Sequence, residues 1–345
     1  MKLIAATAFL LLSGFAIAQR IDDKHAYSPP GRLVDIGGYR LHLNCTGKNG
    51  PTVVLISGAG DFSFDWALVQ PDVARFGRVC SYDPAGLAWS DPGPTPRTMV
   101  QDAFELHALL KAARIKGPYV LVGHSLGGLM ARVYAETYAK EVAGMVLVDS
   151  THEDTTLIFQ GKFVRMRERA SGTPVPPPQT MRSSPPQPPT AEDLAQFESN
   201  QTASGPRKIR SPFDKLPASA QALRLWVLSQ PPRAAGSPDF LAEELQTIYL
   251  ARAKTPYQLG DRPLVVLLSR AQYGNPPRGI SVDDWKRINE EKRQQKVEFT
   301  NLSRNSKLIV AEMSGHHIQL DEPQVVTDSI RLVINAVRRR TRLAP

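Results

Sequence analysis

Short apolar runs and segments with helical spacing follow one another along most of the chain. Continuous apolar runs are typical of strands that are buried on both faces, as in a parallel sheet. We expect strands at residues 32–35, 39–44, 52–57, 78–82, 119–123, 144–149, 263–268 and 307–310. Apolar residues recur every three or four positions, the spacing of a helix, in residues 100–113, 126–139 and 325–337.

The order of these elements predicts an α/β fold. Strands that alternate with helices form a mostly parallel sheet with helices on both faces. The first two strands are the exception, because Gly37-Gly38 between them predicts a hairpin. We therefore expect an eight-stranded, mostly parallel sheet in a core that spans residues 32–150 and 262–345.

One interval, residues 151–261, interrupts the alternation. Its two proline-rich stretches, residues 173–178 and 184–189, resist regular structure, so we expect a mobile loop there. Residues 218–227 and 239–254 have helical patterns. A disordered linker between two domains is the alternative, but it would leave the strands on either side without a common sheet. We therefore interpret the interval as a cap inserted into one domain.

The first residues have the pattern of a signal peptide. Lys2 precedes an apolar run, residues 3–16, which leads into Ala16-Ile17-Ala18, a small-x-small cleavage pattern. The run is short for a transmembrane anchor, and no later segment resembles a membrane span. We expect residues 1–18 to be removed and a polar N-terminal arm to occupy residues 19–31. The protein should then be secreted or periplasmic, with no stable membrane insertion.

The net charge of +9 raises the question of a nucleic-acid partner. The basic residues are scattered, however, and the densest run, Arg338 to Arg340, lies where the last expected helix ends. Cations at a helix C-terminus complement the helix dipole. We therefore expect no nucleic-acid partner. The sequence leaves the oligomeric state open.

The strongest chemical signal is Gly123-His124-Ser125-Leu126-Gly127, which joins a buried strand directly to a helix. This is the G-x-S-x-G nucleophile elbow in the strand–turn–helix context that it requires. The serine hydroxyl must project from a tight turn at the sheet edge, and a side chain two residues before or after would collide with its neighbours. Ser125 is therefore the candidate nucleophile.

The other parts of a serine hydrolase site have candidates at the expected places. Ser57-Gly58-Ala59-Gly60 follows a buried strand, so the amides of Ala59 and Leu126 are the candidate oxyanion donors. The general base should be a histidine after the last strand, where His316 and His317 compete. We favour His316, which directly follows Gly315.

The acid of the triad has two candidates. Asp149 ends the strand that follows the nucleophile. The strand at residues 263–268, after which the acid often lies, is followed by no carboxylate before Asp283. Asp283 stands near an expected helix start, where aspartate is also a common cap. We favour Asp149, with Asp283 as the alternative.

The chain resembles the α/β-hydrolase superfamily in three segments, residues 51–91, 117–154 and 311–323. Together these segments cover most of the chain outside the expected cap. The layout is similar to that of the haloalkane dehalogenases, one branch of which has an acid where Asp149 stands. Those enzymes use an aspartate nucleophile, whereas this chain has Ser125. The resemblance also implies that the second and fourth strands are neighbours. Cys45 and Cys80 would then form a disulfide, with two buried free thiols as the alternative.

These residues together predict a serine hydrolase that acts on a small-molecule carboxylic ester through an acyl-enzyme on Ser125. No metal or organic cofactor is implied. A perhydrolase or haloperoxidase-like enzyme would use the same triad with peroxide. A small-molecule-binding protein on the same scaffold is the alternative outside enzymology.

Overall fold

The computed structural model describes residues 27–159, 162–170, 184–205, 207–235, 241–270, 276 and 279–343. The expected signal peptide, most of the N-terminal arm and the first expected proline-rich stretch lie outside the described residues. Within the described residues, no helix is both long enough and apolar enough to cross a membrane.

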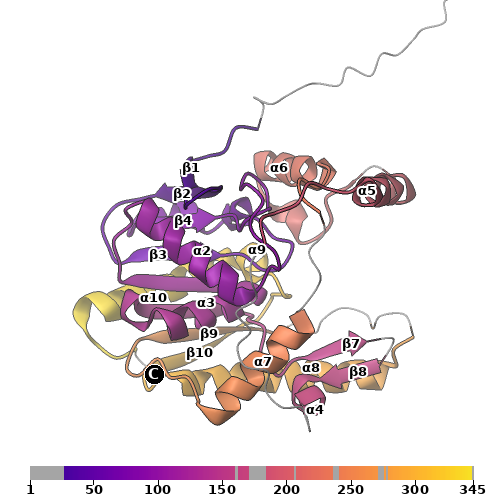
Figure 1. Ribbon diagram of the computed structural model, residues 1–345. Helices are drawn as coiled ribbons and strands as arrows, with labels where there is room; N and C mark the ends of the chain where they lie inside the picture. The colour runs from indigo at the N-terminus through magenta and orange to yellow at the C-terminus, as the bar shows by residue number, and fades with distance from the viewer. Residues whose placement is uncertain are drawn as a thin grey trace, which may run out of the picture.

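An eight-stranded sheet in the order β1-β2-β4-β3-β5-β6-β9-β10 forms the centre of the molecule (Figure 1). Its strands are β1 Arg32–Asp35, β2 Arg40–Thr46, β3 Thr52–Ile56, β4 Val79–Tyr82, β5 Tyr119–His124, β6 Val142–Val148, β9 Leu264–Ser269 and β10 Ser306–Ala311. The pairs β1–β2 and β2–β4 are antiparallel, and the pairs from β4 to β10 are parallel. The expected α/β-hydrolase fold is therefore confirmed, with strand bounds shifted by up to two residues.

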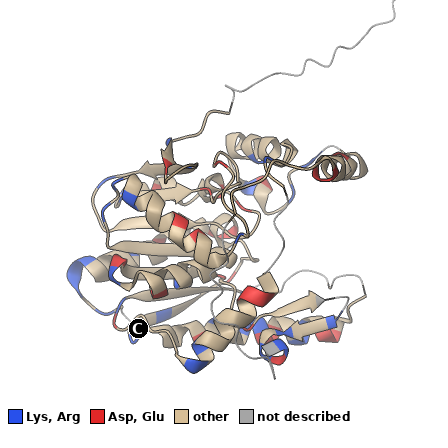
Figure 2. Cartoon of the chain, in the orientation of Figure 1, with Lys and Arg blue, Asp and Glu red and all other residues tan. Residues whose placement is uncertain are grey.

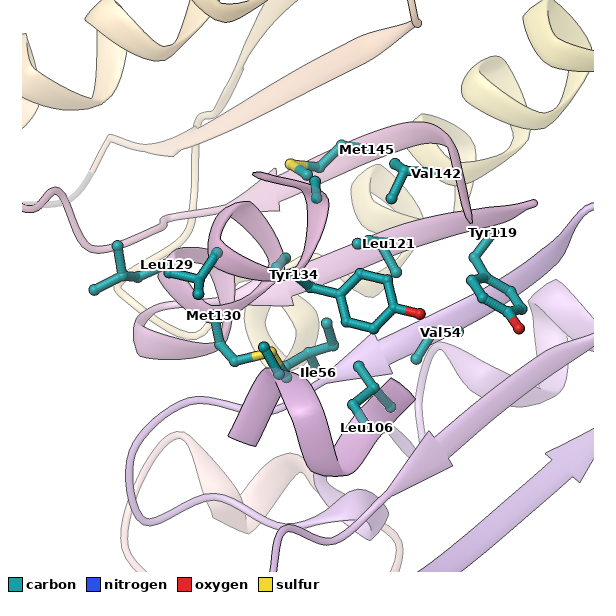
Figure 3. Close-up of a cluster of buried hydrophobic side chains, with 14 of the residues drawn as sticks. Val54, Ile56, Leu106, Tyr119, Leu121, Leu129, Met130, Tyr134, Val142 and Met145 are labelled. Carbon is teal, nitrogen blue, oxygen red and sulfur yellow. The ribbon is translucent and has the colours of Figure 1, made fainter. Parts of the chain in front are cut away.

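Helices cover both faces of the sheet because alternate strand residues point to opposite sides. Leu121 of β5 packs in one apolar cluster with α2 (Met99–Ala112) and α3 (Leu126–Thr137), which Figure 3 shows. Its neighbour Val120 packs in a second cluster, with α1 (Gln70–Ala74) and α10 (Pro323–Arg339), on the opposite face. Burial on both sides explains why the central strands are apolar at every position.

The segment between β6 and β9 contains both expected helices, which begin or end within two residues of the expected positions. These are α6 (Ala218–Ser229) and α7 (Leu241–Lys254). It also contains elements that the sequence pattern did not predict: β7 Thr156–Phe159, β8 Lys162–Arg165, α4 Met166–Ala170 and α5 Ala191–Ser204. Figure 1 shows α5 and α6 on one side of this segment and the β7–β8 hairpin with α4 and α7 on the other.

Two further helices flank the last strand. They are α8 (Val282–Glu298), between β9 and β10, and the short α9 (Ile318–Asp321). The 3-10 helices are η1 Ser63–Trp66, η2 Ala139–Glu141, η3 Phe213–Lys215 and η4 Phe299–Leu302. Ser281 caps α8 by accepting a hydrogen bond from the Asp284 amide. The expected helix start near Asp283 is thereby confirmed.

The expected disulfide between Cys45 and Cys80 is present. The antiparallel register of β2 and β4 places the two cysteines directly opposite each other, with a Cα–Cα distance of 4.0 Å. The bond closes a chain separation of 35 residues and fastens β2 to the parallel part of the sheet.

The basic C-terminal end of α10 has a structural role. Arg338 donates hydrogen bonds to the backbone carbonyls of Gly50 and Phe76. Basic residues occupy the last turn of the helix and complement its dipole (Figure 2).

Candidate active site

Ser125 occupies the sharp turn between β5 and α3. Its φ of 53° lies in the left-handed region, which a non-glycine residue enters at a cost of about 1–3 kcal/mol. The turn is held by the Ser125 amide, which donates to Val148, and by its carbonyl, which accepts from the Thr151 amide at 2.9 Å. The backbone of β6 and of the loop after it thus fixes the direction of the Ser125 side chain.

Two glycines make this turn possible. A Cβ added to Gly123 would lie 2.4 Å from the Gly127 carbonyl oxygen, and one added to Gly127 would lie 2.4 Å from the Ser57 carbonyl oxygen. Both contacts are with backbone, which cannot move aside cheaply. A side chain at Gly123 or Gly127 would therefore collide with the backbone, as the motif predicts.

The structure brings Ser125, His316 and Asp149 into one hydrogen-bonded chain. Ser125 Oγ lies 2.9 Å from His316 Nε2, and His316 Nδ1 lies 2.6 Å from Asp149 Oδ2. The three residues follow β5, β10 and β6, so they meet at the carboxyl edge of the parallel strands. His317, the competing base, faces Asp61 instead.

Asp149 is buried and its carboxylate is saturated with donors. Its Oδ1 accepts from the Ser269 hydroxyl at 3.1 Å and from the Ser269 amide at 3.3 Å. Its Oδ2 faces both His316 and, at 2.7 Å, the Lys296 ammonium. The alternative acid, Asp283, is exposed in the first turn of α8. The geometry thus places Asp149, and not Asp283, at the histidine.

The electrostatics keep the acid charged and the base neutral. Burial alone would raise the pKa of Asp149, but Lys296 and His316 together hold that pKa well below its usual range. Burial, together with the neighbouring His124 and Lys296, lowers the pKa of His316 to about 4 against the raising effect of Asp149. At neutral pH the imidazole can therefore accept a proton.

The alpha/beta hydrolase family model matches residues 53–329, which include the elbow, the buried acid and the histidine. The chain belongs to the alpha/beta hydrolase family.

Its relatives in this family are distant in sequence. An AB hydrolase superfamily protein of Gibberella zeae is 24% identical over 84% of this chain and 87% of its own length. Two other curated relatives match over 131 and 137 residues, which are 19% and 21% of their own lengths. The chain thus spans only about a fifth of these relatives.

Solved structures agree in fold. The enol-lactonase from Burkholderia xenovorans LB400 has a TM-score of 0.56 at 16% identity and covers 88% of this chain and 100% of its own. A thermophilic esterase from Thermogutta terrifontis has a TM-score of 0.52 at 19% identity, with 89% and 98% covered. At these identities the likeness shows the hydrolase fold alone.

The two candidate oxyanion donors of this hydrolase come from segments that pass close to Ser125. Leu126 is the first residue of α3, and the first amides of a helix have no partner within it. Ala59 lies in the loop after β3, which passes close to the nucleophile, since a Cβ added to Gly58 would be 3.0 Å from the Ser125 Cβ. Their role as donors remains a prediction.

A second buried cluster lies beside the triad. Asp61 Oδ2 is 3.2 Å from His124 Nδ1 and 3.4 Å from His317 Nε2. Burial alone would raise the pKa of Asp61, but the two histidines hold it well below its usual range. The other ring nitrogen of His124 donates to the carbonyl of His316 at 2.9 Å. The cluster therefore ties the loop after β3 to the elbow and to the loop after β10.

Within the ranges that the structure describes, this cluster is the one group of side chains able to hold a metal ion. The second oxygen of Asp61, however, faces the Arg224 guanidinium at 3.5 Å. A cation of the protein thus already compensates the carboxylate. We interpret Asp61, His124 and His317 as a structural cluster that holds the loops of the site together, and we assign no metal to it.

Sequence reasoning did not single out Lys296, Asp61 or Arg224. Asp61 directly follows the glycine-rich loop, and this position could have drawn attention to it. Lys296 is one of several lysines in a strongly charged helix, and Arg224 is one of several arginines between β6 and β9. No local pattern distinguishes these two from solvent-exposed cations.

Proposed function

We propose that this protein is a serine hydrolase that cleaves small-molecule carboxylic esters through an acyl-enzyme on Ser125. The observation that carries the proposal is the unbroken chain from Ser125 Oγ through both ring nitrogens of His316 to Asp149. An ionised carboxylate only accepts hydrogen bonds, so Nδ1 carries the proton and Nε2 presents its lone pair to the Ser125 hydroxyl.

The reaction follows from this tautomer. His316 Nε2 takes the proton of Ser125 Oγ as the oxygen attacks the ester carbonyl, and the amides of Leu126 and Ala59 stabilise the oxyanion. His316 then gives the proton to the leaving alcohol, and an acyl group remains on Oγ. A water molecule repeats the attack, with His316 again taking and returning a proton, and releases the carboxylic acid.

A panel of p-nitrophenyl acetate and butyrate tests the proposal. The wild type should turn over at least one ester, and Ser125→Ala should lower kcat by about 10⁴-fold or more, as removal of a triad member does. Thermal unfolding should show that the variant remains folded.

The two neighbouring histidines supply a matched control. His316→Gln should lose activity as Ser125→Ala does, whereas His317→Gln should lose far less, because the His317 ring faces Asp61 and not the serine. Turnover that requires added peroxide would indicate a perhydrolase. Turnover that survives Ser125→Ala would refute the proposal.

A further inference from the structure

Lys296 brings a positive charge into the interior, next to the triad. It lies on α8 and is only 5% exposed. Its Nζ is 2.7 Å from Asp149 Oδ2, the same oxygen to which His316 Nδ1 donates at 2.6 Å. One carboxylate oxygen of Asp149 therefore faces two donors, the His316 ring and the Lys296 ammonium.

The hydrogen bonds of Asp149 do not require this lysine. Ser269 already donates twice to Oδ1, and His316 donates to Oδ2. Taking an ammonium out of water costs several kcal/mol, which the attraction to a single carboxylate only partly offsets. A neutral side chain could fill the space without that cost, so the charge itself calls for an explanation.

The charge acts on the histidine through the shared oxygen. In a Ser-His-Asp triad the carboxylate stabilises the imidazolium that forms during the reaction. A cation on the same carboxylate oxygen opposes that stabilisation and favours the neutral imidazole. The ion pair also holds Asp149 Oδ2 in place, because a charge-assisted hydrogen bond is short and strong.

Charged and titratable groups from several elements lie around His316. Asp149 lies at the end of β6, Lys296 on α8, and His124 at the end of β5 with its ring centroid 4.7 Å from that of His316. His317 belongs to the same loop, with a ring centroid distance of 5.4 Å. Lys292, one turn before Lys296, adds a second positive charge on α8. Asp149 is the acid that contacts the imidazole, and Lys296 is its direct counter-charge.

We propose that Lys296 is a positioning residue of the triad. It orients Asp149 and reduces the stabilisation that the Asp149 carboxylate gives to protonated His316, so that the base stays neutral in mildly acidic solution. The proposal rests on the proposed function, because it assigns His316 as the base of Ser125.

The test is the pH dependence of Ser125 labelling by a fluorophosphonate probe, which requires neutral His316 and no knowledge of the natural substrate. In the wild type the acid limb of the labelling rate should lie well below pH 6.5. Lys296→Met should raise the limb by about one pH unit or more, with about a tenfold loss of rate per unit below the limb. Lys296→Arg keeps the charge and should leave the limb near its wild-type position.

Lys286→Met is the matched control, since Lys286 lies on the same helix but is exposed. It should change nothing. If Lys296→Met fails to fold, Lys296→Gln, which can still donate to Asp149, replaces it. A wild-type limb at or above pH 6.5, or a Lys296→Met loss of equal size at every pH, would overturn the proposal and leave Lys296 a structural residue.

The failure of this proposal is distinguishable from failure of the proposed function. Labelling without ester turnover would refute the ester reaction and still test Lys296. If the wild type is not labelled at all, an NMR titration of the His316 ring in the wild type and in Lys296→Met decides the matter. A pKa that does not rise on removal of Lys296 would then refute the role proposed for this lysine.

Discussion

Two residues at the ends of neighbouring strands, Ser125 and Asp149, have left-handed backbones, with φ values of 53° and 43°. Such conformations persist only where the surroundings hold them, and they gather at functional sites. The Asp149 amide donates to Leu267 at 3.0 Å, so β9 fixes the acid as β6 fixes the nucleophile. The two strained turns place the side chains on either side of His316.

Replacement of Asp149 should change both the activity and the stability of the protein. Asp149→Asn should lower kcat by about 10⁴-fold, because the amide favours the wrong imidazole tautomer. It should also lower the free energy of unfolding by about 3–5 kcal/mol, since Lys296 would keep a buried charge without its acid. Thermal unfolding and ester kinetics on the same preparation measure both effects.

Two companion variants separate these effects. Asp149→Asn with Lys296→Met should regain stability without regaining activity. Asp283→Asn should change neither quantity, because Asp283 is exposed on α8. An inactive Asp283→Asn beside an active Asp149→Asn would reassign the acid.

The residues of the triad were accessible to sequence reasoning because each follows a strand that its apolar run reveals. Ser125, Asp149 and His316 stand directly after β5 and β6 or in the loop after β10. Lys296 was not accessible in this way. Its position depends on how α8 packs against the sheet, and a lysine in a charged helix has the pattern of a solvent-exposed residue.

The elements of the core and those outside it differ in how well their patterns predict them. Central strands are buried on both faces and appear as continuous apolar runs. By contrast, α5 has no buried residue, so its sequence lacks the apolar stripe of a packed helix. Its one clear local signal is the capping box of Thr190 and Asp193.

Arg224 of helix α6 contacts the candidate oxyanion loop. Arg224 forms a buried ion pair with Asp65 and donates to the Gly60 carbonyl at 3.3 Å. Its guanidinium carbon also lies 3.4 Å from the ring centroid of Phe213. Because Gly60 directly follows Ala59, this contact links the segment between β6 and β9 to the position of a proposed oxyanion donor.

We therefore expect Arg224→Lys to lower kcat for esters about tenfold, less than the loss of an oxyanion donor itself. Lysine keeps the charge but cannot reproduce the fork that reaches two acceptors at once. Arg233→Lys is the control, because Arg233 also binds loop carbonyls, those of Gly86, Ala88 and Ser90, in another loop. Equal losses in the two variants would show that contacts between this segment and the core act alike wherever they lie, and would refute the specific link between Arg224 and Ala59.

The strand order of the main sheet brings residues from distant parts of the chain to the carboxyl edge of its parallel strands. The loops after β3, β5, β6 and β10 supply Ala59, Ser125, Asp149 and His316, and α8 supplies Lys296. The family match and the fold establish an alpha/beta hydrolase. The step from that family to an ester hydrolase rests on the geometry at Ser125.

The most direct test of that step is peptide mapping after treatment with a fluorophosphonate. The wild type should carry one phosphonate per chain, on the hydroxyl of Ser125, because Ser125 Oγ lies against Nε2 of His316, whose other ring nitrogen faces the buried Asp149. Ser125→Ala should carry none at the same dose. Labelling that persists in Ser125→Ala, or a wild type that resists the probe while ester turnover continues, would contradict the assignment of Ser125 as the nucleophile.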